Sequence, residues 1–402
     1  MKKGNTEFHA NTWSSQREFN PSTSAPLREK KSGWQIKTFG DVLEIRNGRN
    51  QREVESADGE FPIYGSAGNV MGMATDYICE AGTTIIGRKG NINSPIYSDT
   101  RFWNVDTAFG LAVKAGMDSR FLYFFCLSYD FSAHNRGTTI PSLVKSELLN
   151  IPIPVPPLAE QQRIVGLLDE AFEGLATAKA IAKKNLQNAS ALFESHLQSV
   201  FTQRGPEWVE TKLDDVTDLI TCGVAKRPEY VPEGIPFLSA KNVKGGQVIW
   251  SGHQYVAEET HRALTKNNKP KIGDILYTRV GSYGEAAIIE RDVEFSIFVS
   301  LTLIKAKPVV LNSFLKHYLN SSAVKELAAD SITGSGVGNL NVGTVREFPI
   351  HLPPLAEQRS IVSKLDHLRE QTQRLVRLYE QKLAALEALK KSLLHQAFTG
   401  DL

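Results

Sequence analysis

The residue types that perform catalysis occur in this sequence, but not at the spacings that catalysis needs. The phosphate-binding pattern GxxxxGK[ST] and the zinc-binding pattern HExxH are both missing from the 402 residues. The three cysteines, Cys79, Cys126 and Cys222, lie far apart, and the nine histidines form no metal-binding pattern. His196 and His395 are expected at the surface of long helices. The sequence therefore contains no recognisable catalytic or metal site.

Two arginines stand at equivalent places in a pattern that occurs twice. Gly82–Gly90 is a predicted β-branched strand that runs into a loop with Arg88. Gly273–Gly281 repeats this pattern with Arg279. These two arginines are therefore the leading candidates for contacts with a ligand.

The two arginines belong to a chain that contains a duplication. The motif Pro156–Gln161 (PPLAEQ) returns as Pro353–Gln358 at an offset of 197 residues, and the match continues without a gap for about 46 residues. Upstream, Trp34 to Ile45 resembles Trp208 to Leu219 at an offset of 174 residues. The globular segments are therefore copies too, and the second is longer by 23 residues.

Each copy of the motif begins a long predicted helix, because the prolines fix an extended approach and cannot lie inside a helix. Apolar residues then recur at three-four spacing, with one threonine among them: Ile164, Leu168, Ala171, Leu175, Ala178, Ala182 and Ile361, Leu365, Leu368, Thr372, Leu375, Tyr379. Both stripes then take an extra step of four, to Leu186 and Leu383, which indicates a stutter near Ala182. We expect the two stripes to pack against each other.

Composition and charge narrow the class of protein. Hydrophobic residues make up 41% and charged residues 22%, as in ordinary globular proteins, and 46 basic against 44 acidic residues leave a net charge of +2. No segment is basic enough to bind nucleic acid by charge alone. There is no apolar run of membrane-spanning length and no apolar signal region at the N-terminus. Together with the scattered cysteines, this predicts a cytoplasmic protein.

The predicted fold class is α+β, with two similar domains separated by two long antiparallel coiled-coil helices and related by a pseudo-twofold axis. Each domain should contain short strands and a helix, near Ser119–Ser132 or Ser313–Ala329, with Asp118 or Asn312 as N-cap. A Gly/Ser/Thr loop should follow, at Gly137–Thr139 or Gly334–Gly336. The predicted segments are a flexible polar tail at 1–32, domain 1 at 33–155, a helix at 156–205, domain 2 at 206–352 and a helix at 353–402.

This order of segments resembles the specificity subunit of type I restriction-modification systems. The resemblance covers residues 33–402, and it rests on the repeated PPLAEQ-x-x-I-V motif and on the ending Ala397–Leu402 (AFTGDL) of the second long helix. It implies that each globular segment is a target recognition domain. The two domains together are expected to read a split, asymmetric DNA sequence with an unspecified spacer, without catalysis by this chain.

The resemblance also implies partners. Two methyltransferase subunits are expected to bind the chain and to use S-adenosylmethionine, so no cofactor is expected in this chain itself. Motor-nuclease subunits are expected to join through them. The long helices are expected to set the spacer and to dock the methyltransferase subunits. The near-neutral charge fits a subunit that shares its grip on DNA with partners.

Candidate base-reading residues are polar side chains in the glycine-rich loops, because contacts with base edges read sequence while phosphate contacts position the protein. In domain 1 they are Arg46, Asn47, Arg49, Arg88, Lys89 and Asn91. In domain 2 they are Lys226, Arg227, Lys241, Asn242, Arg279 and Tyr283. For each residue the alternative is a solvated loop side chain without a ligand.

Two other classes of protein remain open. A DNA adenine methyltransferase with its own target domain would need a Pro-Pro pair followed by an aromatic residue, whereas both pairs here precede a leucine, Leu158 or Leu355. A chain of that class would bind S-adenosylmethionine without a partner subunit, so a failure to bind it would exclude this class. A purely structural coiled-coil adaptor is the other alternative, and sequence-specific DNA protection by a reconstituted complex would exclude it.

Overall fold

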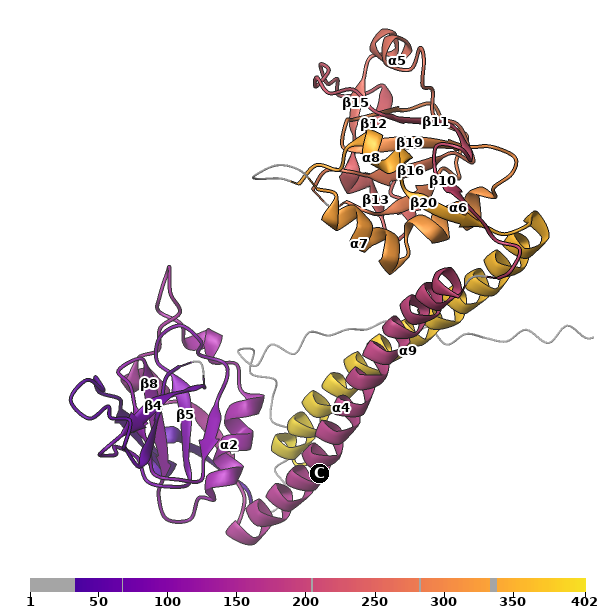
Figure 1. Ribbon diagram of the computed structural model, residues 1–402. Helices are drawn as coiled ribbons and strands as arrows, with labels where there is room; N and C mark the ends of the chain where they lie inside the picture. The colour runs from indigo at the N-terminus through magenta and orange to yellow at the C-terminus, as the bar shows by residue number, and fades with distance from the viewer. Residues whose placement is uncertain (1–32, 67, 204, 282, 333–337) are drawn as a thin grey trace, which may run out of the picture. The chain divides into compact units, whose positions relative to one another are not determined.

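The computed structural model describes residues 33–402 apart from residues 67, 204, 282 and 333–337 (Figure 1). The predicted tail at 1–32 and the predicted loop Gly334–Gly336 lie outside the described residues. By its packing the chain divides into two units. Unit 1 comprises the residues up to Ala180 together with Leu383–Leu402, and unit 2 comprises Ile181–Lys382. Each unit holds one globular domain and a stretch of both long helices.

Domain 1 is built on an antiparallel sheet with the strand order β2-β8-β5-β6. A second sheet has the order β4-β3-β7, with β3 and β7 parallel, and β1 pairs with β9. The elements are β1 (Gln35–Thr38), α1 (Phe39–Val42), β2 (Leu43–Asn47), β3 (Phe61–Tyr64), β4 (Val70–Ala74), β5 (Thr83–Gly87), β6 (Ile96–Ser98), β7 (Trp103–Asn104), β8 (Ala108–Val113), α2 (Ser119–Ser128), the 3-10 turn Phe131–His134, α3 (Lys145–Leu148) and β9 (Pro152–Val155). Strand β5, with the sequence TTIIG, is buried along its whole length, including its two threonines, so both of its faces are covered.

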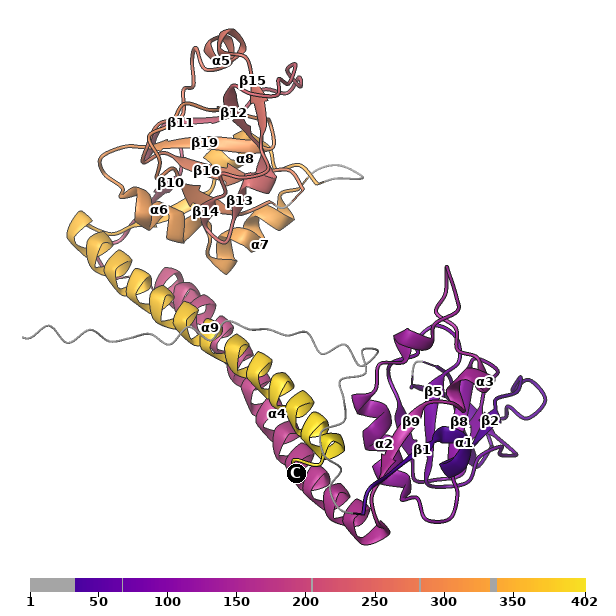
Figure 2. The ribbon, with the colours of Figure 1, turned by 180° about the vertical axis from the view of Figure 1, so that it is seen from behind.

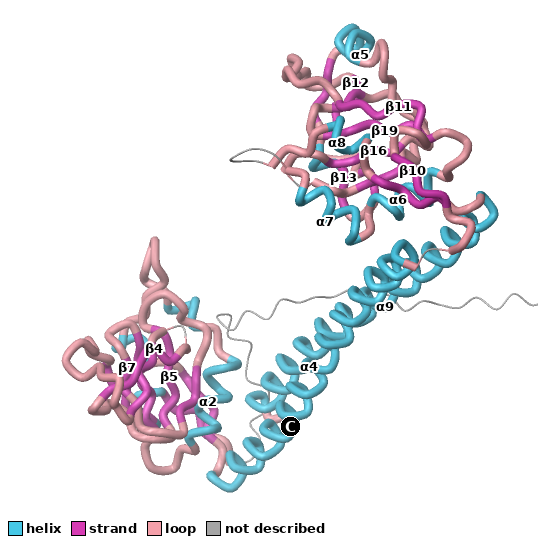
Figure 3. The backbone as a smooth tube through the Cα atoms, in the orientation of Figure 1, coloured by secondary structure: helices cyan, strands magenta, loops and turns pink. Residues whose placement is uncertain are grey.

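Domain 2 repeats these sheets strand for strand, with the orders β11-β19-β16-β17 and β15-β12-β18 and the pair β10-β20. Its elements are β10 (Val209–Lys212), β11 (Thr217–Cys222), β12 (Ile235–Leu238), the 3-10 turn Ala240–Asn242, β13 (Val243–Lys244), β14 (Gln247–Val248), β15 (Gln254–Val256), α5 (Glu258–Leu264), β16 (Ile275–Thr278), β17 (Ala286–Ile288), β18 (Ser296–Ile297), β19 (Leu301–Ala306), α6 (Asn312–Leu319), α7 (Ser322–Asp330), α8 (Val342–Arg346) and β20 (Pro349–Leu352). The predicted duplication and the α+β class are therefore confirmed (Figure 3).

The long helices are α4 (Leu158–Thr202) and α9 (Leu355–Thr399), and each begins directly after its predicted Pro-Pro pair. Within unit 1 the two helices lie side by side (Figure 2), with Lys390 over the ring of Phe172 and Lys179 paired with Glu387. Within unit 2, Arg369 lies over the ring of Phe193. Because residue numbers rise along α4 while they fall along α9, the helices are antiparallel, as predicted.

The end of each long helix completes the core of a globular domain. In unit 1, Phe398 of α9 contacts Phe121 and Phe125 of α2, with ring centroids 5.1 and 5.4 Å apart. In unit 2, Phe201 of α4 makes the corresponding contacts with Phe314 and Tyr318 of α6, at 5.4 and 5.5 Å. Each domain therefore buries apolar side chains from the helix that starts after the other domain.

A buried glutamine fastens the start of each long helix to its domain, which explains why the motif ends in Gln. Gln161 accepts a hydrogen bond from the Asp118 amide at 2.7 Å and donates to the carbonyls of Gly116 and Pro156. Gln358 has the same contacts, accepting from the amide of Leu311 at 2.9 Å. Neither side chain is exposed to solvent. The amides thus satisfy main-chain groups where helix and domain meet.

We expect Gln358→Ala to lower the free energy of unfolding by about 1–3 kcal/mol, because it leaves buried main-chain groups without partners. Urea unfolding of the wild type and the variant measures the loss. Gln162→Ala is the matched control, since Gln162 is exposed at the same turn of the other helix. Equal midpoints for both variants would contradict this role of the glutamine.

Three details of the prediction need correction. Asp118 caps α2 through the amides of Arg120 and Phe121, as predicted, but Asn312 is the first residue of α6 and caps nothing. The helix predicted at Ser313–Ala329 is two helices, because Ser321 is extended with φ −67° and ψ 152°, while Asn320 before it bonds both main-chain groups of Ala286. Leu375 is 37% exposed, and Val376 occupies the buried stripe instead.

Candidate nucleic-acid interface

One end of the four-stranded sheet in domain 1 gathers most of the predicted base-reading residues. Strands β2 and β5 end there and β8 begins there, because Asn47 pairs with Phe109 and Gly87 pairs with Ala108. Asn47 and Arg49 lie at the end of β2 and just after it. Arg88, Lys89 and Asn91 follow β5. Four of these five side chains, all except Arg88, are exposed.

A further loop joins this end of the sheet. The Leu143 amide donates to the Arg88 carbonyl at 2.8 Å, and the Gly90 amide donates to the Pro141 carbonyl at 2.9 Å. The loop therefore carries Ile140, whose side chain is 60% exposed, to the same end. We call these loops (residues 47–50, 87–93, 105–107 and 136–142) the domain 1 loop cluster. Sequence analysis did not select Ile140; the signal was an apolar residue inside the polar loop after Gly137.

Two arginines of domain 1 differ in where their guanidinium groups lie and in what these groups contact. Arg88 is half-buried, with Nη1 donating to the Asp106 carbonyl at 3.3 Å and the guanidinium 5.7 Å from the ring of Phe109. Its other guanidinium nitrogens have no hydrogen-bond partner among the described residues. Arg46 instead lies on a sheet face, where Nη1 donates to the Ile78 carbonyl at 3.0 Å and Glu44 is 3.9 Å away. Arg46 thus also supports the sheet, and its role in reading bases stays a prediction.

Domain 2 has an equivalent loop cluster. Strands β11 and β16 end where β19 begins, because Cys222 pairs with Thr302 and Thr278 pairs with Leu301. Lys226 and Arg227 follow β11, and Arg279 and Tyr283 follow β16. Lys241 lies in the turn after β12, where the Ala240 amide donates to Ser300 Oγ just before β19. We call the described loop residues at this end (223–227, 239–242, 279–281, 283, 284 and 338–340) the domain 2 loop cluster.

Two candidates in this cluster are buried and hydrogen-bonded inside the domain. Arg279 is only 7% exposed, and its Nε and Nη1 donate to the carbonyls of Leu340 and Val299 at 2.8 and 3.1 Å. Asn242 is 1% exposed and donates to the carbonyls of Ile249 and Ser251 while accepting from the Ser239 amide. Both side chains hold loops in place by these internal hydrogen bonds. Their role in reading bases stays a prediction, and the structure indicates a supporting role for each.

In the described residues, the two buried thiols are not reactive and the acidic and histidine side chains form no metal site. Burial raises the pKa of the Cys79 thiol to about 12 and raises that of Cys126 further still, so both thiols are protonated and unreactive at neutral pH. No group of three or more His, Cys, Asp or Glu side chains in the described ranges could hold a metal ion. No described helix is long and apolar enough to cross a membrane.

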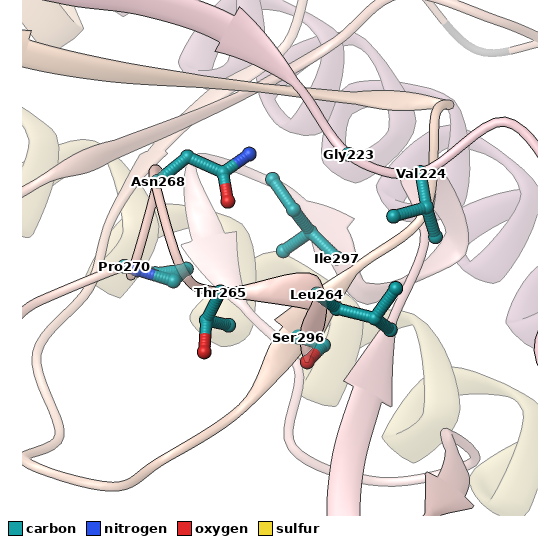
Figure 4. A pocket seen from close by; sticks show the side chains of 8 residues that line it. All are labelled: Gly223, Val224, Leu264, Thr265, Asn268, Pro270, Ser296 and Ile297. Atoms are coloured by element: carbon teal, nitrogen blue, oxygen red, sulfur yellow. The ribbon is translucent and has the colours of Figure 1, made fainter. Parts of the chain in front are cut away.

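A small pocket in domain 2 does not change this conclusion. The residues that line it are Gly223, Val224, Leu264, Thr265, Asn268, Pro270, Ser296 and Ile297 (Figure 4). Its volume is about 10 Å³, which is room for roughly one water molecule. It is far too small for a nucleotide or a cofactor.

Comparisons with known proteins agree with this architecture. The family described as "Type I restriction modification DNA specificity domain" matches residues 31–185 and again residues 206–388. The type I restriction enzyme MjaVIII specificity subunit of Methanocaldococcus jannaschii is 22% identical over 92% of this chain and 93% of its own. The EcoBI specificity subunit of Escherichia coli is 22% identical over 79% of this chain and 73% of its own.

Solved structures share the fold. A chain from a structure described as "Structural basis underlying complex assembly and conformational transition of the type I R-M system" has a TM-score of 0.75 and 20% identity, covering 93% of this chain and all of that one. The HsdS subunit from Thermoanaerobacter tengcongensis has a TM-score of 0.61 and 21% identity, covering 94% of this chain and 99% of its own.

The two duplicated domains, each with a loop cluster at one end of its four-stranded sheet, give the chain the two-domain architecture that the family match indicates. The chain belongs to the family of type I restriction-modification specificity subunits. It is a recognition subunit of a restriction-modification complex and is not itself catalytic.

Proposed function

We propose that domain 1 and domain 2 each read one half of a bipartite, asymmetric DNA sequence. The observation that supports this proposal is the pair of loop clusters, which lie at equivalent ends of equivalent sheets but carry different side chains. Domain 1 offers Arg88, Lys89 and Ile140, whereas domain 2 offers Lys226, Arg227 and Tyr283. Equivalent placement suits the same mode of approach to a groove, while different side chains select different bases.

Sequencing of methylated adenines tests this reading of DNA directly. In cells that express this chain with its methyltransferase partner, we expect a two-part methylated sequence with an unspecified spacer. A continuous methylated sequence without a spacer would contradict a division of labour between the domains. Methylation without sequence preference would instead indicate that the chain is a structural adaptor.

The partners belong to the same proposal. Two methyltransferase subunits, which carry S-adenosylmethionine, dock on the long helices, and motor-nuclease subunits join through them. Support comes from large apolar side chains that are exposed at repeat-equivalent positions: Leu192 and Leu389 are 50% and 48% exposed, and Ile181 and Leu378 are 52% and 54% exposed. Each pair on one helix is 11 residues, or about three turns, apart and so lies on one face. Two equivalent apolar faces suit two copies of one partner.

We expect Leu192→Glu to reduce the bound methyltransferase subunits from two to one per chain, and Leu192→Glu with Leu389→Glu to remove both. A buried carboxylate without a partner opposes docking at each apolar face. Native mass spectrometry of the reconstituted complex counts the subunits. Gln198→Glu is the control, because Gln198 is exposed on another face of α4. Full occupancy in the double variant would place docking elsewhere.

We expect Arg88→Ala to weaken binding of the complex to its target DNA by about 1–3 kcal/mol, the cost of one lost bidentate base contact. Titration of target and unrelated DNA at one salt concentration measures it. An equal loss on both DNAs would make Arg88 a phosphate contact, and no loss would leave it a solvated loop residue. Arg279→Ala is the contrasting variant: it should lower the stability of domain 2, because its guanidinium bonds two buried carbonyls.

A further inference from the structure

At one pair of repeat-equivalent positions, the long helices carry an aromatic ring in unit 1 and an arginine in unit 2. Phe172 of α4 and Arg369 of α9 are equivalent, at the offset of 197 residues. Phe172 packs edge-on against Phe124 of domain 1, with ring centroids 5.4 Å apart. In domain 2 the residue corresponding to Phe124 is His317, which donates from Nε2 to Asp366 at 2.8 Å. Arg369 therefore has no apolar partner of this kind on its domain.

A hairpin that is extra to domain 2 reaches Arg369 instead. Strands β13 and β14 are joined by Gly245 and Gly246, whose φ values of 62° and 71° suit a two-residue hairpin turn. Arg369 Nη2 donates a hydrogen bond to the Gly245 carbonyl, and the Gly246 amide donates to Glu285 Oε1 at 3.1 Å. The Arg369 guanidinium also lies 5.8 Å from the ring of Phe193. One arginine thus joins α4, α9 and the hairpin.

The hairpin is directly continuous with the domain 2 loop cluster. It begins one residue after Asn242, which is hydrogen-bonded inside the turn that carries the exposed Lys241. Its tip is bonded to Glu285, which ends the loop of Tyr283. Two candidate base-reading loops are therefore held within a few residues of the contact with Arg369. Domain 1 has no corresponding hairpin among its described residues.

The contact has little packing beside it. A groove of about 480 Å³ separates α4 and α9 from this edge of domain 2. Phe193, Lys325 and Arg377 are among the residues that line it. In unit 2 the aromatic packing comes from α4 instead, because the ring of Phe193 lies 6.3 Å from the ring of His317. This leaves Arg369 on α9 free to form the hydrogen bond that joins α9 to the hairpin.

We infer that Arg369 is a positioning residue, which holds the β13–β14 hairpin on α9 and thereby fixes how domain 2 presents Lys241 and Tyr283 to DNA. This inference rests on the proposed function of domain 2. It assigns to unit 2 a polar attachment through Arg369, whereas unit 1 has Phe172 at the equivalent position. The half of the DNA sequence read by domain 2 should therefore depend on a residue that touches no DNA.

Hydrogen exchange on the full chain tests the attachment without DNA. We expect amide exchange in residues 243–248 to be about tenfold faster in Arg369→Ala, since a lost bond to a charged donor corresponds to at least a tenfold larger opening constant. Arg369→Lys should give an intermediate rate, because it keeps the charge over Phe193 but loses the planar fork. Arg377→Ala lines the same groove from the same helix and should leave the rate unchanged. Equal rates in Arg369→Ala and the wild type would overturn the attachment.

Methylated-adenine sequencing of the assembled complex tests the positioning. Arg369→Ala should relax base preference in the half read by domain 2 and leave the other half unchanged, while Arg369→Lys restores part of the preference. An unchanged sequence despite faster exchange, or equal relaxation of both halves, would overturn it. If the wild-type complex itself shows no two-part sequence, the positioning role falls with the proposed function, while the exchange result still decides the attachment.

Discussion

Exchange of residues 33–150 for the equivalent domain of a relative changes one half of the methylated DNA sequence and leaves the other half as it was. We expect this result because the domain 1 loop cluster is built from residues between 47 and 142, whose strand pairs and loop hydrogen bonds lie within domain 1. Sequencing of methylated adenines in cells with the chimeric chain measures both halves at once. The effect is large, because a whole set of base contacts is replaced together.

The exchange needs one structural precaution. The donor domain must keep apolar side chains in place of Phe121 and Phe125, because Phe398 of α9 packs between them. The reciprocal exchange of residues 206–352 is the control, and it should change only the other half of the sequence. A chimera that alters both halves would show that the domains do not read DNA independently.

Four residues added to each long helix are expected to lengthen the unspecified spacer by about one to two base pairs. Both helices continue from one unit into the other, so four residues at about 1.5 Å each add about 6 Å to both, and duplex DNA rises about 3.4 Å per base pair. The insertions belong after Ala180 and after Lys382, next to Ala182, where the two units meet along the chain and their internal contacts are kept. Four residues are close to one turn, so the buried stripes stay nearly in phase.

Methylated-adenine sequencing of the insertion variant decides the question. Both half-sequences should persist, because no residue of either loop cluster is touched. An unchanged spacer in an active complex would mean that the bound methyltransferase subunits, rather than the helices, set the distance. An insertion of two residues per helix is the informative control, since it turns the apolar stripes away from each other and should destabilise the chain.

The long helices could be predicted from the sequence, while the free or occupied state of single loop side chains could not. The helices are local: Pro156-Pro157 and a three-four apolar stripe are enough to mark them, and α4 begins at Leu158. Arg88 and Arg279 share the same local pattern, yet Arg279 is buried. It donates hydrogen bonds to the carbonyls of Val299 and Leu340, which lie 20 and 61 residues away in the chain. No short pattern contains those partners.

The β13–β14 hairpin and the buried glutamine of the PPLAEQ motif each have a signal in the sequence. The adjacent Gly245 and Gly246 are a known mark of a tight hairpin, and they point to β13 and β14. The glutamine of the PPLAEQ motif is polar and recurs at the first turn of two amphipathic helices, on their buried side. Such a residue requires buried main-chain partners. Leu375 was misassigned to the buried stripe because Val376 follows it, and an apolar pair leaves the phase of the stripe ambiguous.

The packing of Phe398 into domain 1 has a consequence for how the chain is made. Domain 1 ends with β9 at Val155, but its core is completed only by α9 residues from Leu394 onward, roughly 240 residues later. At about 5–20 residues per second, a ribosome needs roughly 12–48 s to synthesise that stretch. During this interval the rings of Phe121 and Phe125 lack their final cover. Of the two domains, the one that is synthesised earlier therefore waits for a helix that is synthesised after both, and its aromatic surface stays exposed to solvent in the meantime.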